Sequence, residues 1–180
     1  MNNMKKIILI DDKSEVQADL SAALEPLLSG KYEVEAWSTQ DAIEKYHANE
    51  DTTNDESNAD EDVWFRFFKK EENVAIVVAD NDLSGYKSVR ISESALADAC
   101  RQAVTPICTY RRAPSAKSAS QSLRGIYGQT KFFTITLDMS PCAETLAPRK
   151  IIALADGFAY IRQRFGALPK EIKQQGPAAI

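Results

Sequence analysis

The fold follows from two stretches of sequence: KKIILIDD at residues 5–12 and VAIVVADND at residues 74–82. Each is a short apolar run rich in branched residues that ends in aspartate. An uninterrupted apolar run of this length is typical of a strand buried on both faces, as in a parallel sheet. We therefore expect two buried parallel strands with aspartates at their carboxyl ends: Asp11 and Asp12 after the first, and Asp80 after the second.

Helical and strand-like patterns alternate through the rest of the chain. Apolar residues recur at helical spacing in six segments: residues 14–27, 38–46, 63–70, 92–103, 116–123 and 146–165. Runs rich in β-branched or aromatic residues lie between some of them: residues 32–37, 105–110 and 132–137. This order predicts an α/β fold, a doubly wound parallel sheet with right-handed crossovers and helices on both faces.

The first predicted helix carries two end signals. Ser14 is followed three positions later by Gln17, a spacing that predicts a capping box at the start of the helix. Pro26 predicts a kink or an end at the other side of the helix.

Composition and charge indicate a globular protein with one core. The chain has 180 residues, of which 44% are hydrophobic and 27% charged. Its formal net charge of −4 comes mainly from residues 50–62, which include seven acidic residues and no basic one. The remaining charge is nearly balanced, which disfavours a nucleic-acid-binding surface. We expect one domain at residues 4–166 with an acidic loop inserted at about 48–62, and a C-terminal tail at 167–180.

Several protein classes are disfavoured. No apolar run approaches the roughly 18 residues of a membrane-spanning helix, and the N-terminal apolar run is too short for a signal peptide. Cys100, Cys108 and Cys142 form no Cys-x-x-Cys pair, which argues against a disulfide framework or a thiolate metal site and predicts a cytoplasmic location. His47 is the only histidine, so mechanisms that need two imidazoles are excluded and a Ser-His-Asp triad is disfavoured.

The helix predicted at residues 63–70 has an aromatic face. Trp64, Phe67 and Phe68 recur at positions i, i+3 and i+4. Two interpretations are open for this face: packing against the sheet, or an exposed surface on which a partner docks.

The aspartates at the strand ends point to metal and phosphoryl chemistry. The carboxyl ends of parallel strands meet at one edge of the sheet, which is where ligands bind in such folds. Three carboxylates gathered there repel one another unless a cation neutralises them. Mg²⁺ prefers oxygen ligands and commonly holds phosphate through one or two carboxylates. We therefore predict a Mg²⁺ site at Asp11, Asp12 and Asp80, with Asp80 as a nucleophile toward a phosphoryl group.

These residues also resemble a known family. The segments IILIDD at 7–12, VVADNDLSG at 77–85 and TPICTY at 105–110 are similar to motifs of response-regulator receiver domains. The resemblance covers residues 4–166 apart from the acidic insertion. It implies a flavodoxin-like, five-stranded sheet with strand order 2-1-3-4-5. It also implies site roles for four residues: metal-binding Asp11 and Asp12, the phosphoacceptor Asp80, and Asp82, whose backbone carbonyl contacts the metal.

The chain departs from the family pattern at the ends of the fourth and fifth strands. Where the family has a Thr or Ser that bonds the phosphoryl group, the sequence has Arg111, with Thr109 two positions earlier. Both are candidate catalytic residues, and an arginine there could either hold phosphate by two bonds or pair with Asp80 and lock the site. The family's lysine after the fifth strand is matched by Lys131 in one register and is missing in the other, which puts Ser140 in its place. The strand-like character of residues 132–137 favours the second register.

The resemblance implies an atypical receiver domain in two-component signal transduction, with Mg²⁺ as its cofactor. Its state would be set by phosphorylation of Asp80 or, in a degenerate receiver, by protein contacts alone. The implied upstream partner is a histidine kinase or phosphotransfer protein. The implied downstream partner is a protein on the face formed by the fourth helix, fifth strand and fifth helix of the alternating order, which correspond to the segments expected at 116–123, 132–137 and 146–165. A homodimer is also open, whereas direct nucleic-acid or membrane binding is not implied. Such a domain is no enzyme beyond its own phosphorylation and dephosphorylation.

Two other classes stay open. Asp80-x-Asp82 after an apolar strand also resembles the nucleophile motif of haloacid-dehalogenase-like phosphohydrolases, in which Asp80 would attack phosphorus and Asp82 would act as general acid. Against this, the Asp11-Asp12 pair precedes the nucleophile strand, whereas that family's acidic pair follows it. In the third class, a scaffold, the aspartates only cap loops and helix starts.

Overall fold

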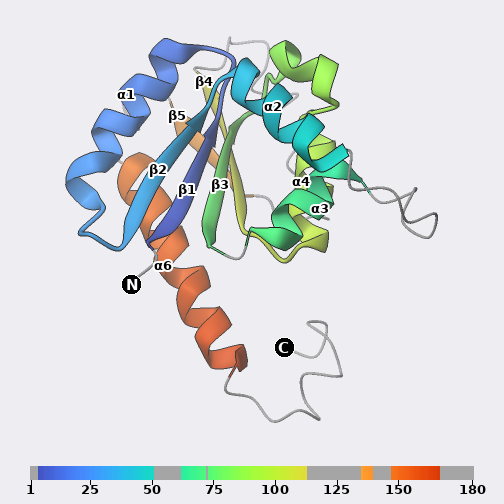
Figure 1. The fold of residues 1–180 in the computed structure, drawn as a ribbon. Coiled ribbons are helices and arrows are strands. Elements are labelled where there is room, and N and C mark those ends of the chain that lie inside the picture. Colours follow the sequence, from blue (N-terminus) through green and yellow to red (C-terminus); the bar gives the residue numbers. More distant parts are fainter. Residues whose placement is uncertain (1–3, 51–61, 72, 113–134, 140–146, 167–180) are drawn as a thin grey trace, which may run out of the picture.

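The computed structural model describes residues 4–50, 62–71, 73–112, 135–139 and 147–166. Strands and helices alternate along the chain, as the sequence pattern predicts (Figure 1). The strands are β1 (Lys5–Ile10), β2 (Tyr32–Trp37), β3 (Val74–Asp80), β4 (Ile107–Arg112) and β5 (Ile135–Met139). The helices are α1 (Ser14–Leu24), α2 (Thr39–Glu50), α3 (Val63–Lys70), α4 (Glu93–Gln102) and α6 (Ala147–Gly166), with 3-10 turns at Glu25–Leu27 and Ser84–Val89.

The strands form a parallel sheet with the order β2-β1-β3-β4, which confirms the predicted α/β class. The backbone of β5 pairs in parallel with β4, and Cys108 lies opposite Ile135. Several predictions fall partly or wholly outside the described residues: the first three residues of the strand expected at 132–137, the helix expected at 116–123, most of the acidic loop expected at about 48–62, and the C-terminal tail expected at 167–180.

Helices cover both faces of the sheet, so each face has its own core (Figure 1). α1 and α6 pack over one face, where Ile7, Leu9 and Ile76 lie. α2, α3 and α4 pack over the other face, on Ile8 and Val77. Every residue of β3 is buried, as are the last four of β1, which confirms that these strands are buried on both faces. Among the helices of the described segments, none is both long enough and apolar enough to cross a membrane.

α3 contributes an aromatic cluster to the second of these cores. Trp64, Phe67 and Phe68 are buried and surround the ring of Trp37 at the end of β2. The Trp64 indole N–H donates to the backbone carbonyl of Val89 at 2.9 Å, so its one polar atom is satisfied inside the core. The interpretation that this face packs inside the protein is confirmed, and the alternative of an exposed docking surface is wrong.

The predicted capping box at the start of α1 is wrong. Lys13 is the N-cap residue, and its side chain makes no capping hydrogen bond. Gln17 is buried instead, and its amide donates to the backbone carbonyls of Asp11 at 2.8 Å and Trp37 at 2.5 Å. These carbonyls follow neighbouring strands in a buried region, where an unpaired acceptor is costly, so they recruit the glutamine away from the helix start. The prediction that α1 ends near Pro26 is confirmed, because α1 ends at Leu24 and Pro26 lies in the following turn.

We expect Trp64→Ala to lower the free energy of unfolding by about 3–5 kcal/mol, because it opens a cavity and leaves the Val89 carbonyl without its donor. Urea denaturation followed by circular dichroism measures this loss. Phe65→Ala is the control, since Phe65 lies on the same helix and is only partly buried. Equal losses in the two variants would contradict the central position of Trp64.

A charged network joins β2 to β1 and α2. The Nζ atoms of Lys6 and Lys45 lie 3.0 and 2.7 Å from the two carboxylate oxygens of Glu35, and the Trp37 indole N–H donates to the same group at 2.9 Å. Burial by itself raises the pKa of Glu35, but the hydrogen bonds from Lys45, Lys6 and Trp37 outweigh it and hold that pKa at about 2. Folding therefore favours the ionised form of Glu35.

This lowered pKa predicts that part of the stability is lost in acid. Glu35 titrates near pH 4.5 when unperturbed, so its contribution is complete above that pH and disappears as the pH falls toward about 2. We expect Glu35→Gln to have a lower melting temperature than the parent near neutral pH. Near pH 2 the two melting temperatures should become nearly equal. Calorimetry across this range measures the gap, with Glu33→Gln on the same strand as control. A gap that stays constant with pH would contradict the assignment.

Candidate metal site at the carboxyl edge of the sheet

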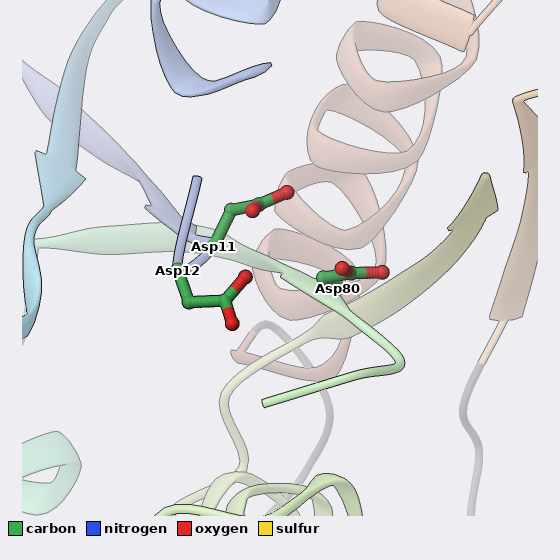
Figure 2. Close-up of side chains that lie close together, drawn as sticks. All are labelled: Asp11, Asp12 and Asp80. Atoms are coloured by element: carbon green, nitrogen blue, oxygen red, sulfur yellow. The ribbon is translucent and has the colours of Figure 1, made fainter. Parts of the chain in front are cut away.

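The candidate site lies where β1 and β3 end side by side. Ile10 pairs with Ala79 in the parallel ladder, so Asp11 and Asp80 come next on neighbouring strands. Figure 2 shows these two side chains and that of Asp12 gathered at this edge. One carboxylate oxygen from each lies within 4.8 Å of the others. The structure thus brings together the three aspartates that the sequence pattern singled out.

The three carboxylates differ in their surroundings. Asp11 and Asp80 are buried, with 1% and 6% of their surface exposed, whereas Asp12 is exposed. Asp11 Oδ1 accepts a hydrogen bond from the backbone N–H of Lys13 at 2.8 Å, and Asp11 Oδ2 accepts one from the Tyr110 hydroxyl. The site therefore has one carboxylate held by donors on both oxygens and one that faces solvent.

Two side chains tie the backbone of Asp11 to the end of β2. The Tyr86 hydroxyl lies 2.6 Å from the carbonyl oxygen of Asp11 and 2.7 Å from that of Trp37, the same two acceptors that Gln17 bonds. Burial, and then the charges of Asp11 and Asp12, raise the pKa of Tyr86, so it stays protonated and can donate. The loops that follow β1 and β2 are thereby held together beneath the carboxylates.

The glycine after β3 makes room for Asp12. A Cβ atom placed on Gly85 would lie 2.7 Å from the Cβ of Asp12, closer than real side chains approach. The φ angle of Gly85 is not positive, so the requirement for glycine comes from this close approach. Any residue larger than glycine at position 85 would therefore displace Asp12.

The end of β4 contributes a residue that sequence reasoning missed. Tyr110 pairs with Asp80 across the ladder and its hydroxyl reaches Asp11. Thr109 is fully buried and pairs with Ala79, and the alternation of side chains places it on the opposite face of the sheet from Tyr110. The backbone of Arg111 continues β4 opposite Asp138, and its side chain lies outside the described part.

The side chain of Asp82 does not belong to the group of three. The Asp82 carboxylate turns back onto its own loop and accepts the backbone N–H of Ser84 at 3.2 Å. The hydrogen bonds from the Ser84 side chain and backbone lower the pKa of Asp82. Lys131 and Ser140, the two candidates for the position after the fifth strand, lie outside the described residues, and β5 falls between them in sequence.

The arrangement can hold a divalent cation of the oxygen-preferring kind. Three carboxylates at one edge supply hard oxygen ligands, and the exposure of Asp12 leaves room for water ligands that Mg²⁺ usually keeps. In chemical terms, a carboxylate beside such a cation can act as a nucleophile toward a phosphoryl group.

Comparisons with known proteins add no relative: no family model, no curated protein and no solved structure matches this chain. The chemistry of the site therefore has to be argued from its own residues.

We expect Gly85→Ala to weaken Mg²⁺ binding at least several-fold, because the added methyl group displaces the backbone or side chain of Asp12. Isothermal titration calorimetry measures the dissociation constant. Gly157→Ala is the matched control, since a Cβ there meets nothing within 4 Å. Gly157 lies within α6, so the Gly157→Ala protein should be more stable than the parent by up to about 1 kcal/mol. Its affinity for Mg²⁺ should be unchanged. Unchanged Mg²⁺ affinity in Gly85→Ala would show that Asp12 is not a ligand.

Proposed function

We propose that this chain is an atypical response-regulator receiver domain in which Asp80 accepts a phosphoryl group. The observation that carries the proposal is the meeting of Asp11, Asp12 and Asp80 at the carboxyl edge of two central parallel strands, with oxygen atoms within 4.8 Å of one another. The motif resemblance supports the same assignment. Within it, residues 4–166 form a flavodoxin-like domain with strand order 2-1-3-4-5, in which β5 is the fifth strand of the sheet.

The proposed reaction is a phosphoryl transfer to a carboxylate. An oxygen of Asp80 forms a bond to phosphorus while the bond from phosphorus to the donor's leaving atom breaks, and the leaving group takes that electron pair. The product is an aspartyl phosphate. Mg²⁺ held by Asp11, Asp12 and the backbone carbonyl of Asp82 would offset the charge of the transferring oxygens.

The proposed partners follow from the resemblance to receiver domains. The phosphodonor is a histidine kinase or phosphotransfer protein, and the output is a downstream protein on the face formed by the helix expected at residues 116–123, β5 and α6. A cytoplasmic location fits such a relay. If the departures at Arg111 and after β5 prevent phosphorylation, the same face acts through protein contacts alone.

The state of Asp82 favours a receiver over a phosphohydrolase. A general acid has to hold its proton near neutral pH, which requires a raised pKa in a carboxyl group. Asp82 is exposed, and the hydrogen bonds from Ser84 lower its pKa. This disfavours the carboxyl group of Asp82 as a general acid.

We expect the parent protein, incubated with Mg²⁺ and acetyl phosphate, to gain one phosphoryl group by intact-protein mass spectrometry. Asp80→Asn should gain none, because the amide is a poor nucleophile. Asp82→Asn should still be phosphorylated, because the substitution leaves the backbone carbonyl in place.

Other outcomes separate the alternatives. Sustained hydrolysis of a phosphate ester that is lost in Asp82→Asn would establish the phosphohydrolase. Mg²⁺ binding without a mass gain would indicate a receiver that acts through protein contacts, and absence of both would indicate a scaffold.

A further inference from the structure

Tyr110 is the residue that contacts both carboxylate-bearing loops. Its backbone carbonyl accepts the N–H of Asn81, directly after Asp80, at 3.1 Å. Its hydroxyl donates to Oδ2 of Asp11, directly after β1. One residue of β4 therefore contacts the ends of both strands that carry the candidate metal ligands, through its backbone at one and its side chain at the other.

The length of the tyrosine side chain is what makes this contact possible. β3 lies between β4 and β1 in the sheet, so the contact passes over one intervening strand. Neighbouring strands lie about 4.8 Å apart, so the two backbones are separated by about 10 Å. A threonine or serine at position 110 could not span this distance, whereas a phenol ring with its hydroxyl can. Tyr110 is 2% exposed, so the ring is fixed by the core while the hydroxyl faces the site.

We propose that Tyr110 is a positioning residue for the metal site: its hydroxyl fixes the Asp11 carboxylate in the orientation that binds Mg²⁺. This inference rests on the proposed function. With the Lys13 N–H on Oδ1 and the Tyr110 hydroxyl on Oδ2, rotation of the carboxylate is restricted at both oxygens. A carboxylate oxygen has two lone pairs, so it can accept a hydrogen bond and also bind a cation. Hydrogen-bond partners of this kind typically change metal affinity by 10- to 100-fold when they are removed.

The test is Mg²⁺ titration of Tyr110→Phe, which removes only the hydroxyl and keeps the buried ring. We expect the dissociation constant for Mg²⁺ to rise about tenfold. Tyr32→Phe is the matched control, because the Tyr32 ring is also buried and its hydroxyl donates to Asp156 at 2.8 Å, away from the aspartate cluster. Its Mg²⁺ affinity should equal that of the parent.

A spectroscopic readout separates positioning from a structural role. Mg²⁺ binding to Asp11 changes the acceptor of the Tyr110 hydroxyl, so the parent should give a tyrosine near-UV difference spectrum on titration. Tyr32→Phe should keep this signal and Tyr110→Phe should lose it. A ring that only fills the core would give no such signal, and this measurement needs only the parent if Tyr110→Phe fails to fold.

The outcomes distinguish this inference from the proposed function. If the parent binds Mg²⁺ while Tyr110→Phe binds it equally well, or if the parent shows no tyrosine difference spectrum, the positioning role is overturned and the receiver proposal stands. If the parent binds no Mg²⁺ at all, both are overturned.

Discussion

The parallel pairing of β1 with β3 is the constraint on which the site depends. Both strands are buried on both faces, and their register places Ile10 beside Ala79. A shift of one residue would turn every side chain of a strand to the other face and bring the polar residue after it into a core. The burial of apolar side chains in β1 and β3 therefore sets the relative position of Asp11 and Asp80. The two aspartates themselves add nothing to the hydrophobic stabilisation.

Gathering three carboxylates at this edge has an electrostatic cost, which the hydrogen bonds to Asp11 reduce. Asp11 receives donors on both side-chain oxygens, and its carbonyl receives Gln17 and Tyr86. These donors are neutral, so they stabilise a carboxylate without cancelling its charge. Asp12 reduces the cost by facing water. Carboxylates whose geometry is fixed by hydrogen bonds in this way offer oxygen ligands of the kind that Mg²⁺ prefers.

Much of the fold was predictable from sequence because burial leaves a local pattern. Two patterns predicted which side chains face the core: the apolar runs of β1 and β3, and the i, i+3, i+4 aromatic residues of α3. The structure confirms both. Gln17 and Tyr110 were not predictable in the same way. A glutamine three residues after a serine satisfies a local capping rule, yet buried carbonyls at two strand ends take it instead. A tyrosine in an apolar strand looks like core, and its hydroxyl's partner is 99 positions away. Local patterns report which face is buried, whereas such contacts follow from how distant strand ends meet.

The same contacts connect the carboxylate edge to the aromatic core. The carbonyls of Asp11 and Trp37 share the donors Tyr86 and Gln17, and the Trp37 ring is held by the rings of α3. Asp11 can move away from Trp37 only by breaking buried hydrogen bonds worth about 0.5–1.5 kcal/mol each, and more where an acceptor is left unpaired. Trp37 in turn can move only by disturbing rings that fill one face of the sheet. The main chain that carries Asp11 is thus held in place by the core itself, whereas the neighbouring side chain of Asp12 is exposed to solvent.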